Sequence, residues 1–308
     1  MTESTPSTSP PSAPTRRSVT FLKRLGSSLL LWSVVVAALF APHPMIAGGC
    51  FVVLMTLLAG AGLLEFYGLV ERRGLVCFKL WGLAAGVLLM ASTFFYLSGA
   101  VLPQRLPSKA NDFETGILVV FVLGLCLRQF VARSNPDGLL AISTTLFGLM
   151  YVPWLLNFVQ KINFIPGADG RLFLIYFLVV TKFSDMGAYA TGSVFGRHKM
   201  IPRISPGKTW EGFAGALVFS VGASLLITAL AGERLTGMNP RHAILLGLIL
   251  AVGAVVGDLI ESLFKREAGL KDSGRLFPGI GGILDLLDSI LFNAPLMYLY
   301  LRHVLTRP

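Results

Sequence analysis

The sequence is poor in charge and in the residue types that usually build a soluble catalytic domain. Only 14% of its 308 residues are Asp, Glu, Lys or Arg, whereas 54% are hydrophobic. The mean hydropathy is +0.71. This composition excludes an ordinary soluble domain and indicates a protein that crosses a membrane several times.

Cysteine and histidine are too few and too scattered to predict a metal centre or a disulfide framework. Cys50, Cys77 and Cys126 form no Cys-x-x-Cys pair and lie in apolar runs, which predicts small buried packing residues. The four histidines form no metal-ligand pattern. The sequence shows no module that binds nucleic acid, so we expect the net charge of +10 to orient loops and to meet anionic lipid.

Apolar runs are the main feature that is present. A bilayer core of ~30 Å requires about 20 helical residues per crossing. The sequence therefore predicts an all-α fold, a polytopic integral membrane helical bundle with about nine transmembrane helices. The sixth span is the least regular, because Lys182 and Asp185 interrupt it. The predicted spans are 25–42, 45–69, 76–100, 115–132, 139–157, 172–190, 212–231, 242–261 and 286–304.

The distribution of basic residues predicts the orientation. With the N-terminus in the cytoplasm, the inside segments carry about twice as many Lys and Arg residues as the outside segments. The polar loops 191–212 and 262–285 then both face the cytoplasm, and we expect a cell inner membrane protein whose active site faces the cytoplasm. The predicted parts are a disordered Ser/Thr/Pro-rich cytoplasmic tail at 1–20, N-terminal transmembrane helices at 21–171 and a catalytic transmembrane region at 172–308.

The segment 183–212, FSDMGAYATGSVFGRHKMIPRISPGKTWEG, combines an acid within a span with a run of cations and hydroxyls. Cations, hydroxyls and backbone N–H groups at a helix start suit a polyphosphate. A Walker A loop is excluded, because Pro202 stands where that loop needs glycine. Simpler alternatives stay open for both features. Asp185 pairs with Lys182 or reaches water, and the basic loop only contacts lipid phosphate. The candidate substrate ligands are Asp185, Ser205, Lys208 and Thr209.

Four acids stand at the ends of two successive spans. Asp258 and Glu261 are three residues apart at the end of one span, and Asp285 and Asp288 are three apart at the start of the next. Residues three apart lie on one face of a helix, so the two pairs can converge. Oxygen ligands at this density suit Mg²⁺, and two cations can bridge a nucleophile and a leaving group.

The simpler alternative for Asp285 and Asp288 is the preference of acids for a helix N-terminus. It does not explain acids at the C-terminal end of the preceding span, which need compensation from a metal, Lys265 or Arg266. Glu65 is another acid within a span, for which a structural role is favoured over a place in the site.

A long motif runs from 262 to 288 and includes the permissive turn FPGIGG, which alternatively is a plain connecting loop. Together with SDMGAY…FGRHK…ISPGKTWEG upstream, it resembles the phosphatidate cytidylyltransferases, also called CDP-diglyceride synthases, over about residues 180–300. The family signature is S-x-x-K-R-x4-K-D-x-G-x3-P-G-H-G-G-x-x-D-R-x-D. Ile280 and Leu286 replace its histidine and its first arginine after the glycines. The matching residues are Ser262, Lys265, Arg266, Lys271, Asp272, Gly274, Pro278, Gly279, Gly281, Gly282, Asp285 and Asp288.

The resemblance implies the reaction of CTP with phosphatidate to give CDP-diacylglycerol and pyrophosphate. It implies Mg²⁺ with a second, monovalent cation such as K⁺, and membrane lipids and a second copy of the chain as candidate partners. The implied metal ligands are Asp258, Asp285 and Asp288. The implied catalytic residues are Lys208, Lys265, Arg266, Lys271 and Asp285. The implied substrate-binding residues are Asp185, Ser205, Lys208, Thr209, Ser262, Lys265, Arg266, Gly281 and Gly282.

Three alternatives stay open at this point. The same chemistry can act on another lipid phosphate, such as an isoprenoid glycerol ether. Ile280 and Leu286 remove polar groups that could touch phosphate, which fits a weakened or inactive homologue. An anion transporter is the alternative from another class, and it predicts internal repeats and charges near the membrane midplane.

Overall fold

The computed structural model describes residues 43–99, 110–132, 137–274 and 281–306. Within these ranges, eight helices are long and apolar enough to cross a membrane. They confirm a helical integral membrane protein and eight of the nine predicted spans, including the sixth. The predicted span 25–42 and the tail 1–20 lie outside the described residues. The division at residue 171 stays a prediction.

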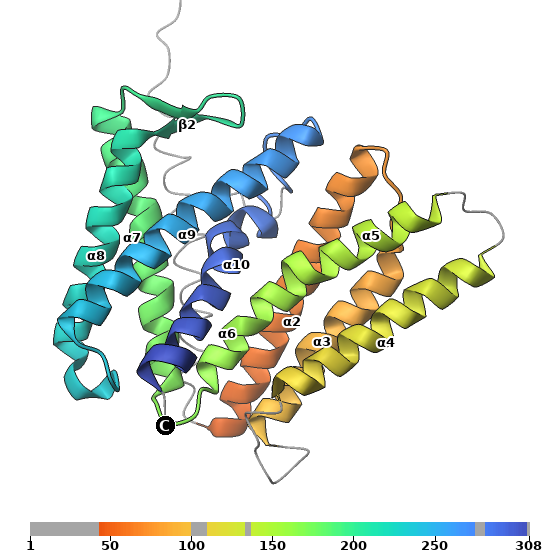
Figure 1. Ribbon diagram of the computed structural model, residues 1–308, viewed down its shortest axis with the longest axis horizontal. Coiled ribbons are helices and arrows are strands. Elements are labelled where there is room, and N and C mark those ends of the chain that lie inside the picture. The colour runs from red at the N-terminus through yellow and green to blue at the C-terminus, as the bar shows by residue number, and fades with distance from the viewer. Residues whose placement is uncertain (1–42, 100–109, 133–136, 275–280, 307–308) are drawn as a thin grey trace, which may run out of the picture.

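Among the described residues, one small hairpin connects α7 (Gly170–Phe195) to α8 (Trp210–Ala231) (Figure 1). The α-helices are α2 (Pro44–Arg72), α3 (Lys79–Ser98), α4 (Ala110–Val131), α5 (Gly138–Leu149), α6 (Leu155–Asn163), α7 (Gly170–Phe195), α8 (Trp210–Ala231), α9 (Pro240–Glu267) and α10 (Ile283–Tyr300). The shorter elements are the π-helices η2 (Met150–Trp154) and η4 (Leu301–Leu305), the 3₁₀ turn η3 (Gly232–Arg234), and the strands β1 (Lys199–Ile201) and β2 (Ser205–Thr209).

Several helix starts follow from local chemistry. The side chains of Asp169, Thr209 and Asn239 precede α7, α8 and α9, and each accepts a hydrogen bond from a backbone N–H of the first turn. Such caps satisfy N–H groups that have no partner within the helix. The span-length helices therefore start close to where the apolar runs predict.

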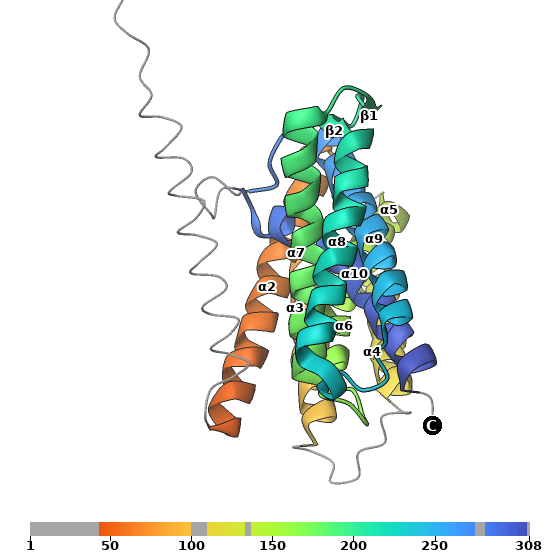
Figure 2. The same ribbon diagram turned by 90° about the vertical axis from the view of Figure 1, so that its left-hand side faces the viewer.

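Helices α7 and α8 lie side by side at one end of the molecule, and α3 and α4 lie at the other (Figures 1 and 2). Helix α10 packs between them, against α9, α6 and α2. Large buried side chains, among them Tyr67, Phe173 and Phe177, fill the core. Outward faces carry exposed apolar side chains such as Phe130 and Leu139, as expected of a surface that contacts lipid.

The span predicted at 139–157 continues to Asn163, because a π turn rather than a break follows α5. Pro153 lies in that turn, which accommodates its missing N–H. The sequence prediction ended early because polar residues follow. The structure buries one of them, Lys161, in an ion pair of 2.6 Å with Glu114 of α4.

The polar loop predicted at 191–212 contains an antiparallel hairpin in which Lys199 pairs with Thr209 and Ile201 pairs with Ser205. The hairpin is tied to the start of α8. The Glu211 carboxylate accepts hydrogen bonds from the backbone N–H groups of Arg197 and His198, at 3.1 and 3.2 Å. Glu211 therefore fixes the position of the hairpin relative to the start of α8.

The prediction that the three cysteines are buried packing residues is wrong. Cys50 and Cys126 are exposed on outer faces of α2 and α4, and Cys77 is half-buried in the connection between α2 and α3. An apolar run does not distinguish a core face from a lipid-facing one, because both are apolar in a membrane helix.

Candidate active site

A polar cavity of about 510 Å³ lies at the hairpin end of the bundle, between α7, α8, α9, α10 and β2. It brings together side chains of the segment 183–212 and of the acid pairs at 258–288, although more than 70 positions separate residue 212 from Asp288. The predicted residues that line it are Asp185, Ser205, Lys208, Thr209, Asp258, Asp285 and Asp288.

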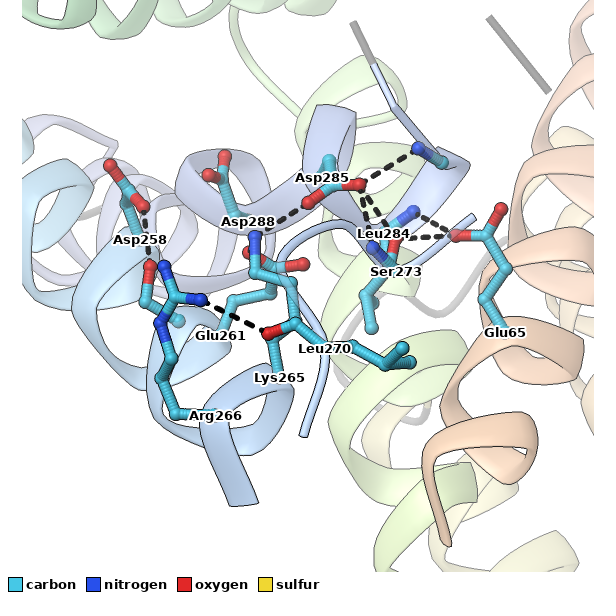
Figure 3. A network of polar contacts seen from close by, with 12 residues as sticks. Glu65, Asp258, Glu261, Lys265, Arg266, Leu270, Ser273, Leu284, Asp285 and Asp288 are labelled. Atoms are coloured by element: carbon cyan, nitrogen blue, oxygen red, sulfur yellow. Dashed lines mark hydrogen bonds and ion pairs between the residues drawn. The ribbon is translucent and has the colours of Figure 1, made fainter. Parts of the chain in front are cut away.

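Two of the predicted metal ligands converge within this region. Oxygen atoms of Asp258, Glu261 and Asp288 lie within 4.8 Å of one another (Figure 3). The crossing of α9 and α10 makes this approach possible: a Cβ atom at Gly257 would lie only 2.5 Å from the Asp288 carbonyl oxygen. Glycine at 257 therefore lets the two acid-bearing helices touch.

Two lysines form ion pairs with two of the acids that line the cavity. Lys208 Nζ of β2 lies 2.8 Å from Asp258 Oδ2 and donates to the Val255 carbonyl oxygen at 3.0 Å. Lys182 Nζ lies 3.2 Å from Asp185 Oδ2, which confirms the pairing left open from the sequence. Asp258 is thus compensated by the hairpin rather than by the adjacent Lys265 or Arg266.

Lys265 bridges Glu261 of α9 and Asp285 of α10. Its Nζ forms ion pairs with Glu261 and, at 2.5 Å, with Asp285 Oδ1 (Figure 3). Arg266 points elsewhere, donating hydrogen bonds of 3.2 Å to the carbonyl oxygens of Ile204 and Leu270. Arg266 therefore connects the hairpin to the end of α9.

Asp285 has a different environment from Asp258 and Asp288. Its Oδ2 accepts hydrogen bonds from Gly282 N–H at 2.8 Å and from Ser273 N–H and O–H at 2.9 Å. It thus caps the start of α10, as the helix-terminus alternative predicts. Asp285 is not part of the group of three carboxylates, and its place among metal ligands stays a prediction.

The three converging carboxylates fit a divalent cation. They offer hard oxygen ligands of the kind that Mg²⁺ prefers. Both Glu261 oxygens are buried; among the described residues Oε1 has no hydrogen-bond partner, whereas Oε2 forms the ion pair with Lys265. Glu261 was absent from the predicted metal set, although its spacing from Asp258 gave the signal that could have included it.

Several other predicted residues, among them Ser262, Gly281 and Lys271, do not line the cavity. Ser262 is buried and donates to Asp258 Oδ1 at 3.3 Å. Thr209 lines the cavity, but its hydroxyl also caps α8 by accepting from Gly212 N–H at 3.1 Å. Gly281 has a φ of 113°, which only glycine adopts readily. Lys271 is exposed beyond the end of α9.

Of the two departures from the family signature, Leu286 is described and Ile280 lies outside the described residues. The Leu286 carbonyl oxygen accepts a hydrogen bond of 3.4 Å from Lys182 Nζ, which also donates to Ser289 Oγ at 3.2 Å. Sequence reasoning gave Lys182 only the role of pairing with Asp185. The structure shows that it also connects α7 to α10.

Comparison with known proteins adds to this geometry. A family model described as the cytidylyltransferase family matches residues 22–304. The chain belongs to the cytidylyltransferase family. Membership confirms the resemblance seen in the 262–288 motif. It also extends the resemblance to the N-terminal helices, which the motif does not reach.

Several curated relatives carry a more specific name. The phosphatidate cytidylyltransferase of Mycobacterium tuberculosis is 37% identical over 185 residues, covering 58% of this chain and 55% of the relative. That of Staphylococcus haemolyticus is 34% identical over 205 residues, covering 66% and 76%. The Escherichia coli protein YnbB is 39% identical over 199 residues, covering 63% and 65%. The chain thus spans roughly half to two thirds of the length of most of these relatives.

Proposed function

We propose that this cytidylyltransferase-family protein transfers the cytidylyl group of CTP to phosphatidate, which gives CDP-diacylglycerol and pyrophosphate. The observation that carries the proposal is the polar cavity, where lysines and carboxylates from four elements converge at one end of an apolar bundle. The names of several relatives support the same reaction. This chain aligns with only part of each relative, so CTP and phosphatidate as its substrates are part of the proposal.

The residues suit a reaction in which the protein supplies position and charge rather than a nucleophile. The lipid phosphate oxygen attacks the α-phosphorus of CTP, the bond to the bridging oxygen breaks, and pyrophosphate leaves with that electron pair. Lys208 and Lys182 place positive charge at the cavity wall. Orientation and charge neutralisation are the main contributions in phosphoryl and nucleotidyl transfer.

The carboxylates have a matching role. We propose that Asp258, Asp288 and Glu261 hold Mg²⁺, with Asp285 as a further candidate ligand and K⁺ as a candidate second ion. Bound Mg²⁺ would supply charge neutralisation at the phosphate oxygens. Lys208 would exchange its ion pair with Asp258 for a phosphate oxygen when nucleotide enters, because its Nζ already lies at the cavity surface.

The orientation is also part of the proposal. The hairpin end carries exposed basic side chains, including Arg197, Lys199 and Arg203, which the positive-inside rule assigns to the cytoplasm. We place this end on the cytoplasmic side of a cell inner membrane, where CTP is available from water. The lipid substrate would reach the same cavity from the inner leaflet.

The test is an assay of the full chain purified in detergent. Phosphatidate, labelled CTP and Mg²⁺ should yield liponucleotide and pyrophosphate in equal amounts. Asp258→Asn and Asp285→Asn should lower turnover by at least about 100-fold. Absence of turnover in the wild type, with isoprenoid glycerol ether phosphates and dCTP also supplied, would refute the proposal.

A further inference from the structure

Glu65 of α2 makes contacts with the start of α10 that the proposed reaction does not explain. Its Oε1 accepts a hydrogen bond from Ile283 N–H at 2.9 Å, and its Oε2 accepts from Leu284 N–H at 2.8 Å. Ser273 Oγ lies 2.8 Å from the same Oε2. All three donors are more than 200 positions away in the chain (Figure 3). Glu65, which lies in an N-terminal helix, thus connects Ser273 to the start of α10.

The glycines of the signature leave room for this carboxylate. A Cβ atom at Gly274 would collide with Glu65 Oε1, and a Cβ at Gly282 would collide with Glu65 Oε2. Both positions therefore have to lack a side chain while the Glu65 carboxylate occupies this space. The Glu65 carboxylate, rather than a turn, explains why these two residues are glycines, since φ is positive at neither of them.

The Glu65 carboxylate supplies hydrogen-bond acceptors that the start of α10 lacks. The first N–H groups of an α-helix have no intrahelical acceptor, and the helix dipole favours negative charge there. Asp285 takes Gly282 N–H, and Glu65 takes the next two. The carboxylates of Glu65 and Asp285 also both contact Ser273 Oγ, at 2.8 and 2.9 Å. The position of Asp285 is thus coupled to that of Glu65.

We infer that Glu65 is a positioning residue for the cavity: from α2 it fixes the start of α10 and, through it, the placement of Asp285 and Asp288. The inference rests on the proposed function for its catalytic consequence. Its structural part stands on the hydrogen bonds and glycine contacts alone. Glu65 does not line the cavity, so its effect on substrate is indirect.

The variant Glu65→Gln separates this role from general stability. The backbone N–H groups of Ile283 and Leu284 can only donate, one to each carboxylate oxygen, whereas a glutamine amide accepts through one atom and donates through the other. The –NH₂ group of Gln would face an N–H group, and the charge that favours the helix terminus would be lost. Glu71→Gln is the matched control, because Glu71 lies on the same helix in an exposed pair with Lys79.

Two measurements test the inference. Hydrogen–deuterium exchange of the peptide that starts α10 should be about tenfold faster in Glu65→Gln and Glu65→Ala, and unchanged in Glu71→Gln. The kcat with phosphatidate and CTP should fall by about 10- to 100-fold in both Glu65 variants. The KM for CTP should change by less than about threefold, since ground-state contacts with nucleotide remain. Unchanged exchange, or a loss confined to KM, overturns the inference.

A double substitution provides a second test. Gly274→Ala should speed exchange at α10 in the wild-type background, because its methyl group takes the place of the Glu65 carboxylate. In the Glu65→Ala background the same substitution should add little. Additive effects would show that Glu65 and Gly274 act separately. If wild-type protein shows no turnover, the proposed reaction fails, while the exchange measurements still decide the role of Glu65.

Discussion

Lys208 Nζ lies 2.8 Å from Asp258 Oδ2, so a residue of the hairpin compensates a carboxylate near the end of α9. The helix dipole disfavours an acid at that end, and neighbouring cations on α9 do not supply the compensation. The hairpin therefore delivers a cation into the cavity. Because the Glu211 carboxylate binds the hairpin backbone at Arg197 and His198, the position of Lys208 is determined by the fold.

We expect Lys208→Met to lower kcat/KM for CTP by about 100-fold, because it removes a cation from the cavity wall. Steady-state kinetics with varied CTP provide the measurement. Lys199→Met is the control, since Lys199 lies on the other strand of the hairpin and does not line the cavity. Equal effects of the two substitutions would show that Lys208 acts only through the general basic charge of the hairpin.

We expect Glu261→Gln and Asp288→Asn to weaken divalent cation binding by at least about tenfold, since each removes an oxygen from the group of three carboxylates. Binding of Mn²⁺ to the full chain, followed by electron paramagnetic resonance, measures this without turnover. Glu233→Gln, an exposed change in η3, should leave the affinity unchanged. Wild-type affinity in both site variants would rule out this group as a metal site.

We expect Glu114→Gln to destabilise the fold by about 3–5 kcal/mol, because it leaves Lys161 buried without its counter-charge. The measurement is the thermal unfolding midpoint in detergent. The double variant Glu114→Gln/Lys161→Met should recover part of the loss, since it removes the unpaired charge. A double variant less stable than Glu114→Gln alone would show that the ion pair is not the cause.

We expect Cys77 to react slowly with thiol reagents near neutral pH. Burial raises the pKa of its thiol, and the nearby Glu71 carboxylate raises it further. A raised pKa means less thiolate at a given pH, so labelling by a membrane-impermeant maleimide should keep accelerating above pH 9. Measured in a Cys50→Ser/Cys126→Ser background, labelling should occur in inverted vesicles and be absent in right-side-out ones.

The pH profile of this labelling has its own control. Glu71→Gln removes the second cause of the raised pKa and should speed labelling at pH 8. Labelling only in right-side-out vesicles would reverse the proposed orientation. The connection between α2 and α3 lies at the same end of the bundle as β2 (Figure 1), and β2 lines the cavity, so the orientation of both is tested together.

The sequence predicted the spans because apolar length alone determines which segments can cross a bilayer. The spacing of three within each span also predicted that acids of the two spans can converge, and Asp258, Glu261 and Asp288 do lie together. The extension of this span from residue 157 to Asn163 was not predictable, because it depends on Glu114 of another helix neutralising Lys161. Lys182 interrupts a span for the same reason without ending it, since Asp185 is its partner.

Contacts between distant segments account for most of what sequence reasoning missed. The sequence suggested Lys265, Arg266 or a metal as compensation for Asp258 and Glu261. Lys265 does pair with Glu261, but Lys208 from the hairpin pairs with Asp258. The local pattern could not show that a glutamate near the start of the chain accepts hydrogen bonds from α10. Such a relation becomes visible only when the two helices are placed side by side.

The seat of the Glu65 carboxylate has a consequence for truncated forms of the chain. A fragment that begins at α7 would retain every residue of the 262–288 motif and every acid of the cavity. It would nevertheless lack the acceptor for the Ile283 and Leu284 amides. Retaining the 262–288 motif is therefore not sufficient for an ordered cavity, and the N-terminal helices contribute to it through one carboxylate as well as through apolar packing.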